Sequence, residues 1–141
     1  MSLRHPESKM SKSSDDINGT IYFNDEKDNI LKKFKSSVTD SENIVRYDLK
    51  NKPGISNLIE IYAAVNDKEI SETEKEFENS QYGEFKIAVA ETVIDYLDPI
   101  KKNFDELTAN DIDDIVVSNL KSAKDSAQKT IIEVEEALGI N

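Results

Sequence analysis

The sequence predicts an all-α fold, a bundle of about five helices preceded by an irregular loop. Apolar residues recur at three- and four-residue spacing over most of the chain after residue 24. Hydrophobic residues make up 37% and charged residues 33% of the 141-residue chain, which is the polar end of a globular composition. Strand and helix patterns do not alternate, so a doubly wound sheet is not expected within this chain.

Residues 1–20 are predicted to form a loop, because Pro6, Gly19 and a dense mixture of Ser, Asp and Lys leave no apolar period. Residues 20–23 read Thr-Ile-Tyr-Phe, a β-prone run that predicts one short extended segment. The helical part of the chain should therefore begin only after residue 23.

The first helix is expected at about 25–38, with Asn24 as its cap. Its buried stripe would consist of Ile30, Leu31, Phe34 and Val38. After a loop over 39–52, Pro53 fits the first position of a second helix. A capping box at 71–74 then predicts a short third helix that buries Phe77.

A long fourth helix is expected at 84–107, because its apolar spacing holds across Pro99, where the helix should be kinked. Asn110 is expected to cap a last helix that reaches about Leu138, and Gly139 suits its end. Both helices should bury one apolar face. In the last helix that face would be Ile112, Ile115, Val116, Leu120, Ala123, Ala127, Ile131, Val134 and Leu138.

The net charge of −11 is unevenly distributed along the chain. Residues 1–52 hold 10 basic and 9 acidic residues, whereas residues 53–141 hold 8 basic and 20 acidic ones. The acidic excess argues against a general nucleic-acid binder, and an anionic ligand would be tolerated best in the first third.

Several classes of site are excluded or not expected. The chain has no cysteine, so disulfides and thiolate metal sites are excluded, and a reducing cytoplasm is allowed. No apolar run approaches the roughly 18 residues needed to cross a bilayer, so no membrane contact is expected. Asp111, Asp113 and Asp114 lack the ordered oxygen spacing of a calcium loop, so no metal site is predicted.

The most informative stretch, residues 9–13, reads KMSKS. Two lysines three positions apart, beside small hydroxyl residues, can place two ammonium groups and several hydrogen-bond donors around one polyphosphate. Cations aimed at a departing phosphate group stabilise charge that builds in the transition state. A loop suits this task because it can close on a nucleotide and reopen. The alternative is a solvated Lys/Ser-rich linker.

KMSKS is also the signature loop of class I aminoacyl-tRNA synthetases, and the rest of the chain resembles bacterial tryptophanyl-tRNA synthetases. The resemblance covers nearly the whole chain, with its segments in the family's order. Those segments are VTDSE at 38–42, IVRYD at 44–48 with Val45 inserted into the family's IRYD, KPGISNL at 52–58, YGEFK at 82–86, and the proline at 99.

Two departures from the family pattern stand out. The family usually continues KMSKS with Asp-Pro, whereas Ser14-Asp15 follows here and leaves both lysines in place. The family also needs a Rossmann catalytic domain with a two-histidine HIGH-type motif, but His5 is the only histidine in this chain. The resemblance therefore implies a carboxy-terminal fragment without the catalytic domain, inactive on its own.

The resemblance assigns residues 1–20 to the signature loop and linker, and residues 21–141 to a helical anticodon-binding domain. In the intact enzyme, Lys9 and Lys12 would be catalytic, stabilising the pyrophosphate that departs from ATP. The ATP and pyrophosphate site would comprise Lys9, Met10, Ser11, Lys12 and Ser13. The implied enzyme is a cytoplasmic homodimer that uses ATP with Mg²⁺ and acts on tRNA(Trp); tryptophan would be held by the missing domain.

Contacts to tRNA are expected on an exposed lysine face of the first helix, with Arg46 as a further candidate. The candidate residues are Lys32, Lys33, Lys35 and Arg46. The alternatives are a merely solvated lysine face and an arginine paired with Asp40 or Asp48. Two other functions stay open, a non-catalytic helical module that binds tRNA or protein and a fragment of a tyrosyl-tRNA synthetase.

Overall fold

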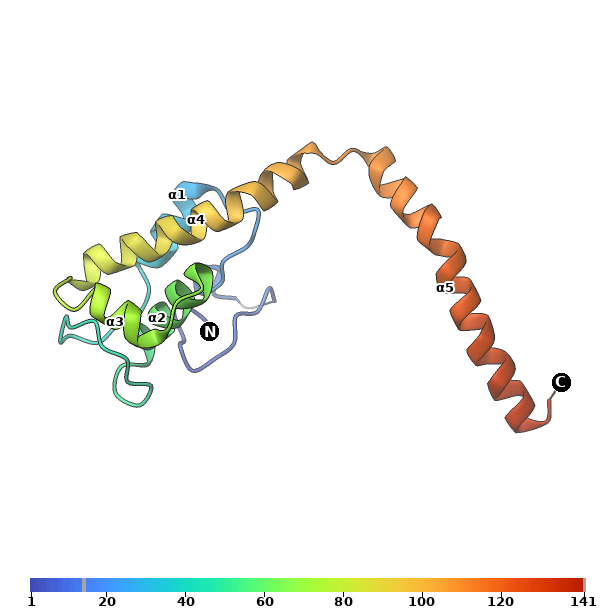
Figure 1. Cartoon of the computed structure of the whole chain (residues 1–141), viewed down its shortest axis with the longest axis horizontal. Helices are drawn as coiled ribbons and strands as arrows, with labels where there is room; N and C mark the ends of the chain where they lie inside the picture. The colour runs from blue at the N-terminus through green and yellow to red at the C-terminus, as the bar shows by residue number, and fades with distance from the viewer. Residues whose placement is uncertain (14, 141) are drawn as a thin grey trace. The chain divides into compact units, whose positions relative to one another are not determined.

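The computed structural model describes residues 1–13 and 15–140 and is drawn in Figure 1. The described residues form five α-helices and one 3₁₀ turn, η1 (Ile17–Gly19), and they contain no strand. The all-α class is therefore confirmed. The chain divides into two compact units, Met1–Lys102 and Asn103–Asn141, and the KMSKS loop belongs to the first.

The first unit contains α1 (Lys27–Lys35), α2 (Pro53–Asn66) and α3 (Ile70–Glu76). Proline stands at the start of α2, as predicted. The capping box of α3 was predicted two residues too late, because Glu69 and Glu72 exchange the capping hydrogen bonds. Phe77 follows α3 directly and packs edge-on against Tyr62, with 5.0 Å between the ring centroids.

Two predictions around α1 were wrong. The helix begins after Glu26, not after Asn24, because the Asp25 carboxylate instead accepts a hydrogen bond from the Tyr22 amide at 3.0 Å. The Asp25 amide donates back to the Tyr22 carbonyl, and this turn ends the expected extended segment. The helix also ends early, because the Val38 amide leaves it and donates to the carbonyl of Leu3 at 2.9 Å.

The helix α4 (Tyr82–Glu106) continues through Pro99 as one helix, and its kink stays a prediction. The helix α5 (Ala109–Leu138) is capped by Thr108, not by Asn110. The Thr108 hydroxyl accepts from the Asp111 amide, and the Asp111 carboxylate accepts from the Thr108 amide at 2.8 Å. Gly139 ends α5 in the left-handed conformation, as predicted.

Apolar side chains of α1, α2 and α4 form the core of the first unit together with Leu3 and Val45. Phe34 and Phe85 are the largest apolar side chains that are almost completely buried there, at 1% and 0% exposed. The apolar face expected to be buried in α5 is exposed, since α5 buries none of its residues. Helical periodicity shows that a helix is amphipathic, but it does not show what covers the apolar face.

Candidate functional site

The KMSKS loop is an excursion of the chain that is closed at its base by backbone hydrogen bonds. The Leu3 amide donates to the Gly19 carbonyl at 2.9 Å, and the Ser2 amide donates to the Ser8 carbonyl at 2.8 Å. A side chain at Gly19 would bring a Cβ within 2.5 Å of the Ser2 hydroxyl, so the close approach suits glycine. The buried Leu3 side chain fixes this base to the core of the first unit.

The predicted phosphate-binding side chains lie on the outside of the loop. Lys9, Ser11, Lys12 and Ser13 are exposed. The Ser11 and Ser13 hydroxyls lie 3.0 Å apart and are hydrogen-bonded to each other. Among the residues that the structure describes, none forms an ion pair with Lys9 or Lys12. Both ammonium groups are therefore accessible to an anionic ligand.

Met10 turns inward between the two exposed lysines. It is half-buried and lines an apolar cavity of about 350 Å³ in the first unit. The other residues around this cavity are Ile21, Phe23, Phe34, Ile61, Val65, Val93, Tyr96 and Leu97. The loop thus has an apolar inner side and a cationic outer side.

The expected exposed lysine face of α1 needs one correction. Lys32 and Lys35 are exposed, but the Lys33 side chain is only 3% exposed. Its ammonium donates to the Thr20 carbonyl at 2.8 Å and to the Asp25 carboxylate at 2.6 Å. The helical pattern alone could not show this, because both acceptors belong to the segment that precedes the helix. Lys33 is therefore removed from the candidate tRNA contacts.

Arg46 is about half exposed, and the structure pairs it with carboxylates. Its guanidinium lies 3.6 Å from the Asp48 carboxylate and 3.9 Å from that of Glu42. Asp48 was one of the two partners considered from the sequence, and Asp40 is engaged elsewhere. Such exposed ion pairs contribute little stability, so Arg46 can exchange a carboxylate for a phosphate at small cost.

Asp40 belongs to a cluster of polar side chains around the buried Lys52, which the sequence analysis missed. The Lys52 side chain is 1% exposed, and its ammonium lies 2.9 Å from Asp40, 2.8 Å from Glu42 and 3.0 Å from the Tyr82 hydroxyl. The Tyr82 hydroxyl donates to the Asp40 carboxylate at 2.7 Å. The available signal was the lysine of KPGISNL together with the two acidic residues of VTDSE.

The pKa values of this cluster show that its charges support one another. Burial by itself lowers the pKa of Lys52, but hydrogen bonds to Glu42, Tyr82 and Asp40 outweigh it and raise the pKa above its ordinary value. Burial likewise acts to raise the pKa of Asp40, but hydrogen bonds from Lys52 and Tyr82 leave it lowered. Both groups are thus ionised at neutral pH, and the cluster fixes the 40–44 loop on the start of α2.

The start of α2 contacts three separate segments of the chain. A Cβ at Gly54 would lie 2.0 Å from the Val38 carbonyl oxygen, so the VTDSE segment passes directly over this glycine. The Ser56 hydroxyl accepts from the Asp48 amide at 2.8 Å. The buried Asn57 amide donates to the carbonyls of Met1 and Ser2, ahead of the KMSKS loop. Each polar residue of KPGISNL therefore has a structural role.

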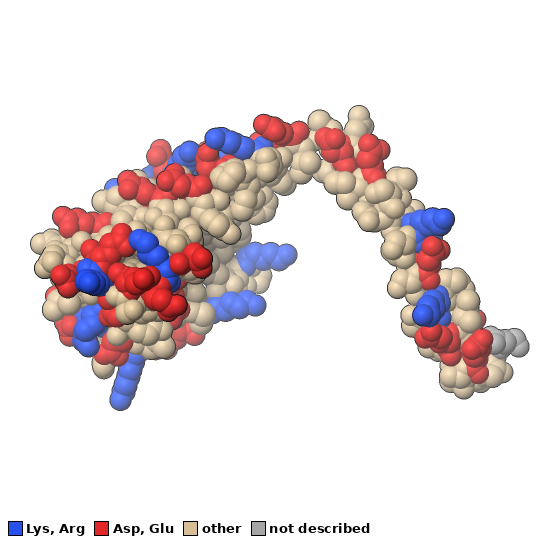
Figure 2. Space-filling model, viewed as in Figure 1, with Lys and Arg blue, Asp and Glu red and all other residues tan. Residues whose placement is uncertain are grey.

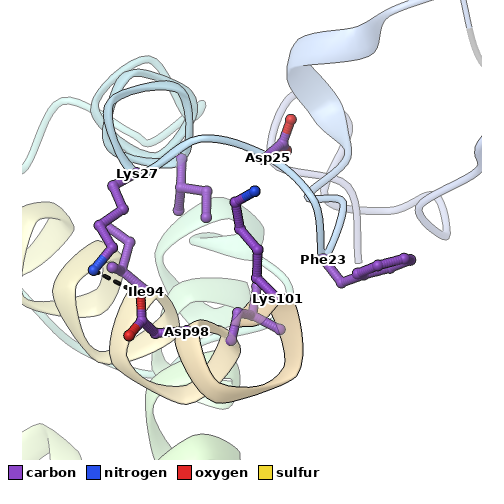
Figure 3. A pocket seen from close by; sticks show the side chains of 8 residues that line it. Phe23, Asp25, Lys27, Ile94, Asp98 and Lys101 are labelled. Carbon is purple, nitrogen blue, oxygen red and sulfur yellow. Dashed lines mark ion pairs between the residues drawn. The ribbon is translucent and has the colours of Figure 1, made fainter. Parts of the chain in front are cut away.

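Charged residues at the junction of α1 and α4 form an ionic clasp (Figure 3). Lys27 of α1 points toward Asp98 of α4, with 2.7 Å between ammonium and carboxylate. Lys102 approaches the same carboxylate at 2.7 Å. Hydrogen bonds from Lys102 and Lys27 lower the pKa of Asp98 to about 2. The adjoining hollow of about 10 Å³ is too small for a ligand, so this clasp joins two helices and is no binding site.

The face of the first unit drawn in Figure 2 shows no large patch of basic side chains. On this face, acidic and basic side chains lie side by side, so any tRNA contact there must be local. Within the described ranges, no three His, Cys, Asp or Glu side chains are grouped as metal ligands. None of the described helices is long and apolar enough to span a membrane.

Comparisons with known proteins agree with the family that the KMSKS loop indicates. The family model described as tRNA synthetases class I (W and Y) matches residues 1–98. The tryptophan–tRNA ligase of Oceanobacillus iheyensis is 44% identical over 141 residues, which are 99% of this chain and 43% of that protein. The ligase of Bacillus subtilis is 41% identical, with the same coverage.

A solved structure shows the same fold. The tryptophanyl-tRNA synthetase of Mycoplasma pneumoniae matches with a TM-score of 0.89 and 27% identity, over 100% of this chain and 43% of that one. This chain thus spans about two fifths of the length of its relatives. The tyrosyl alternative has less support, because these relatives are tryptophan–tRNA ligases. With its KMSKS loop and a family match over residues 1–98, the chain belongs to the class I tRNA synthetases of the W and Y family.

Proposed function

We propose that this chain is the carboxy-terminal part of a bacterial tryptophan–tRNA ligase, which activates tryptophan with ATP and transfers it to tRNA(Trp). The observation that carries the proposal is the pair of exposed lysines, Lys9 and Lys12, on a loop whose base is fixed to the core. The names of the relatives support tryptophan as the amino acid.

The chemistry assigned to the loop is the departure of pyrophosphate. The tryptophan carboxylate attacks the α-phosphorus of ATP, and the bond from that phosphorus to the bridging oxygen of pyrophosphate breaks. Negative charge then grows on the leaving group, where Lys9 and Lys12 stabilise it more in the transition state than in the ground state. The hydroxyls of Ser11 and Ser13 offer further donors. Mg²⁺, when bound with ATP, neutralises part of the phosphate charge.

The remainder of the chain is proposed to face tRNA. Lys32 and Lys35 are the exposed cations of α1, and Arg46 is held only by weak surface pairs. The functional boundary near residue 20 is part of this proposal, as are the cytoplasmic location and the homodimeric state of the intact ligase. The chain by itself should not activate an amino acid, because it spans only 43% of the length of the tryptophan–tRNA ligases that it resembles.

The test is amino-acid-dependent exchange of pyrophosphate into ATP by the full-length ligase. Exchange is expected with tryptophan and not with tyrosine. Lys12→Ala should slow it about 10²- to 10³-fold, the usual effect of losing one donor to a developing charge. Lys75→Ala, which removes an exposed lysine of α3, should leave the rate unchanged. A Lys12→Ala enzyme with undiminished exchange would defeat the mechanism, and a full-length protein without exchange would favour the non-catalytic module.

A further inference from the structure

We propose that Thr20, Tyr22 and Lys33 form a cradle beneath the KMSKS loop that orients its backbone at Ser11 and Lys12, so that the Lys12 side chain faces outward toward the phosphates. The inference rests on the proposed function and adds three positioning residues to it. None of the three would touch ATP, because each acts on the inner side of the loop.

Lys33 binds the segment that carries Thr20 and Tyr22 to α1. Its buried ammonium donates to the Thr20 carbonyl and to Asp25, and it lies 5.0 Å from the centre of the Tyr22 ring. A buried lysine is costly unless its charge is paired and its donors are used. The contacts of Lys33 therefore hold the segment 20–25 in one position against α1.

Thr20 and Tyr22 connect this fixed segment to the KMSKS loop through hydrogen bonds. The Thr20 hydroxyl donates to the Ser11 carbonyl at 3.3 Å, and the Tyr22 hydroxyl donates to the Lys12 carbonyl at 3.4 Å. The half-buried Met10 side chain packs against the core of the first unit. The loop backbone is thus held by hydrogen bonds at residues 11 and 12, next to the anchored Met10, and the side chain of Lys12 is left exposed.

The strength of these contacts fits a loop that must move. Both hydrogen bonds are longer than the usual 2.7–2.8 Å for hydroxyl donors, so each is weak. Weak bonds can bias the loop toward one orientation and still release it when it closes on ATP. Since catalysis depends on prior positioning of charge, loss of either bond should slow the ATP-dependent step without changing the binding of tryptophan.

The test uses Thr20→Val and Tyr22→Phe in the full-length ligase, with matched controls. Thr73→Val removes a hydroxyl that donates to the Glu69 carbonyl, also at 3.3 Å, and Tyr47→Phe removes one bound to Glu60. Steady-state pyrophosphate exchange gives kcat and the KM values for ATP and tryptophan. Urea unfolding of each variant measures stability.

Each cradle variant should lower kcat/KM for ATP about 3- to 10-fold, the range expected for one weak hydrogen bond, and leave KM for tryptophan unchanged. The controls should keep wild-type kinetics. In a Lys12→Ala background, Tyr22→Phe should have little further effect, because the bond it removes acts through Lys12. Cradle variants that behave like their controls, or that add their full effect to Lys12→Ala, overturn the cradle. Exchange unaffected by Lys12→Ala itself would instead overturn the proposed function.

Discussion

Replacing Lys52 should destabilise the first unit more than replacing any exposed lysine. Lys52→Met keeps an apolar stem but leaves the Asp40 and Glu42 carboxylates and the Tyr82 hydroxyl without their shared cation. Breaking a buried ion pair typically costs about 3–5 kcal/mol. The side chains of Asp40 and Glu42 are 21% and 57% exposed and can recover some hydration. We therefore expect the lower end, about 3 kcal/mol.

Tyrosine fluorescence during urea unfolding measures this loss, because all five tyrosines lie before residue 103, in the first unit. With an m-value of about 2 kcal/mol/M, the midpoint should fall by about 1.5 M urea. Lys68→Met is the control. Its ammonium also binds a carboxylate, that of Glu76 at 2.6 Å, but at a position 35% exposed, so a much smaller loss of stability is expected than for Lys52→Met. Equal shifts for the two variants would refute the reasoning from burial.

Two further predictions concern stability. Gly54→Ala should lower the free energy of unfolding by about 3 kcal/mol or more, because its Cβ would lie 2.0 Å from the Val38 carbonyl oxygen. The control Gly83→Ala should be neutral or stabilising, because no atom lies within 4 Å of the added Cβ. Urea midpoints measure both effects, and equal midpoints would refute the prediction. Because Lys102 and Lys27 lower the folded pKa of Asp98 from 3.8 to about 2, its contribution is present above pH 4 and is lost as the pH falls from 4 to 2. Asp98→Asn should therefore flatten the stability profile in that window, and an unchanged slope would contradict this.

Features set by neighbouring residues could be predicted from the sequence, and features set by distant contacts could not. Pro53 and Gly139 stand where local backbone chemistry requires them, so the start of α2 and the end of α5 were correct. Thr108 and Asn110 are both good caps, and the choice between them depends on which one Asp111 reaches back to. The burial of Lys33 depends on a carbonyl thirteen residues away, which no helical period records.

The two lysines of the KMSKS loop are exposed, and their role in binding a polyphosphate stays a prediction from the residue types. The inner side of the loop was not foreseen. Thr20 and Tyr22 belong to a run that was predicted to be extended because its residues are β-prone. The hydrogen bonds from their hydroxyls to the Ser11 and Lys12 carbonyls depend on how the chain folds back, which the local sequence does not show. Sequence motifs therefore indicated which groups carry charge, while the fold was needed to show what holds them.

The segments that carry the family resemblance fall into two physical classes. The lysines and serines of KMSKS are exposed, and only Met10 of this motif packs against the core. The segments at 38–42, 44–48 and 52–58 instead contact one another around the start of α2, through Lys52, Gly54 and Ser56. Asn57 extends the same junction to the base of the loop. These three segments thus fix the base of the KMSKS loop, whereas only the exposed lysines are placed to bind phosphate. Variants of the first class should change catalysis at constant stability, and variants of the second should change stability first.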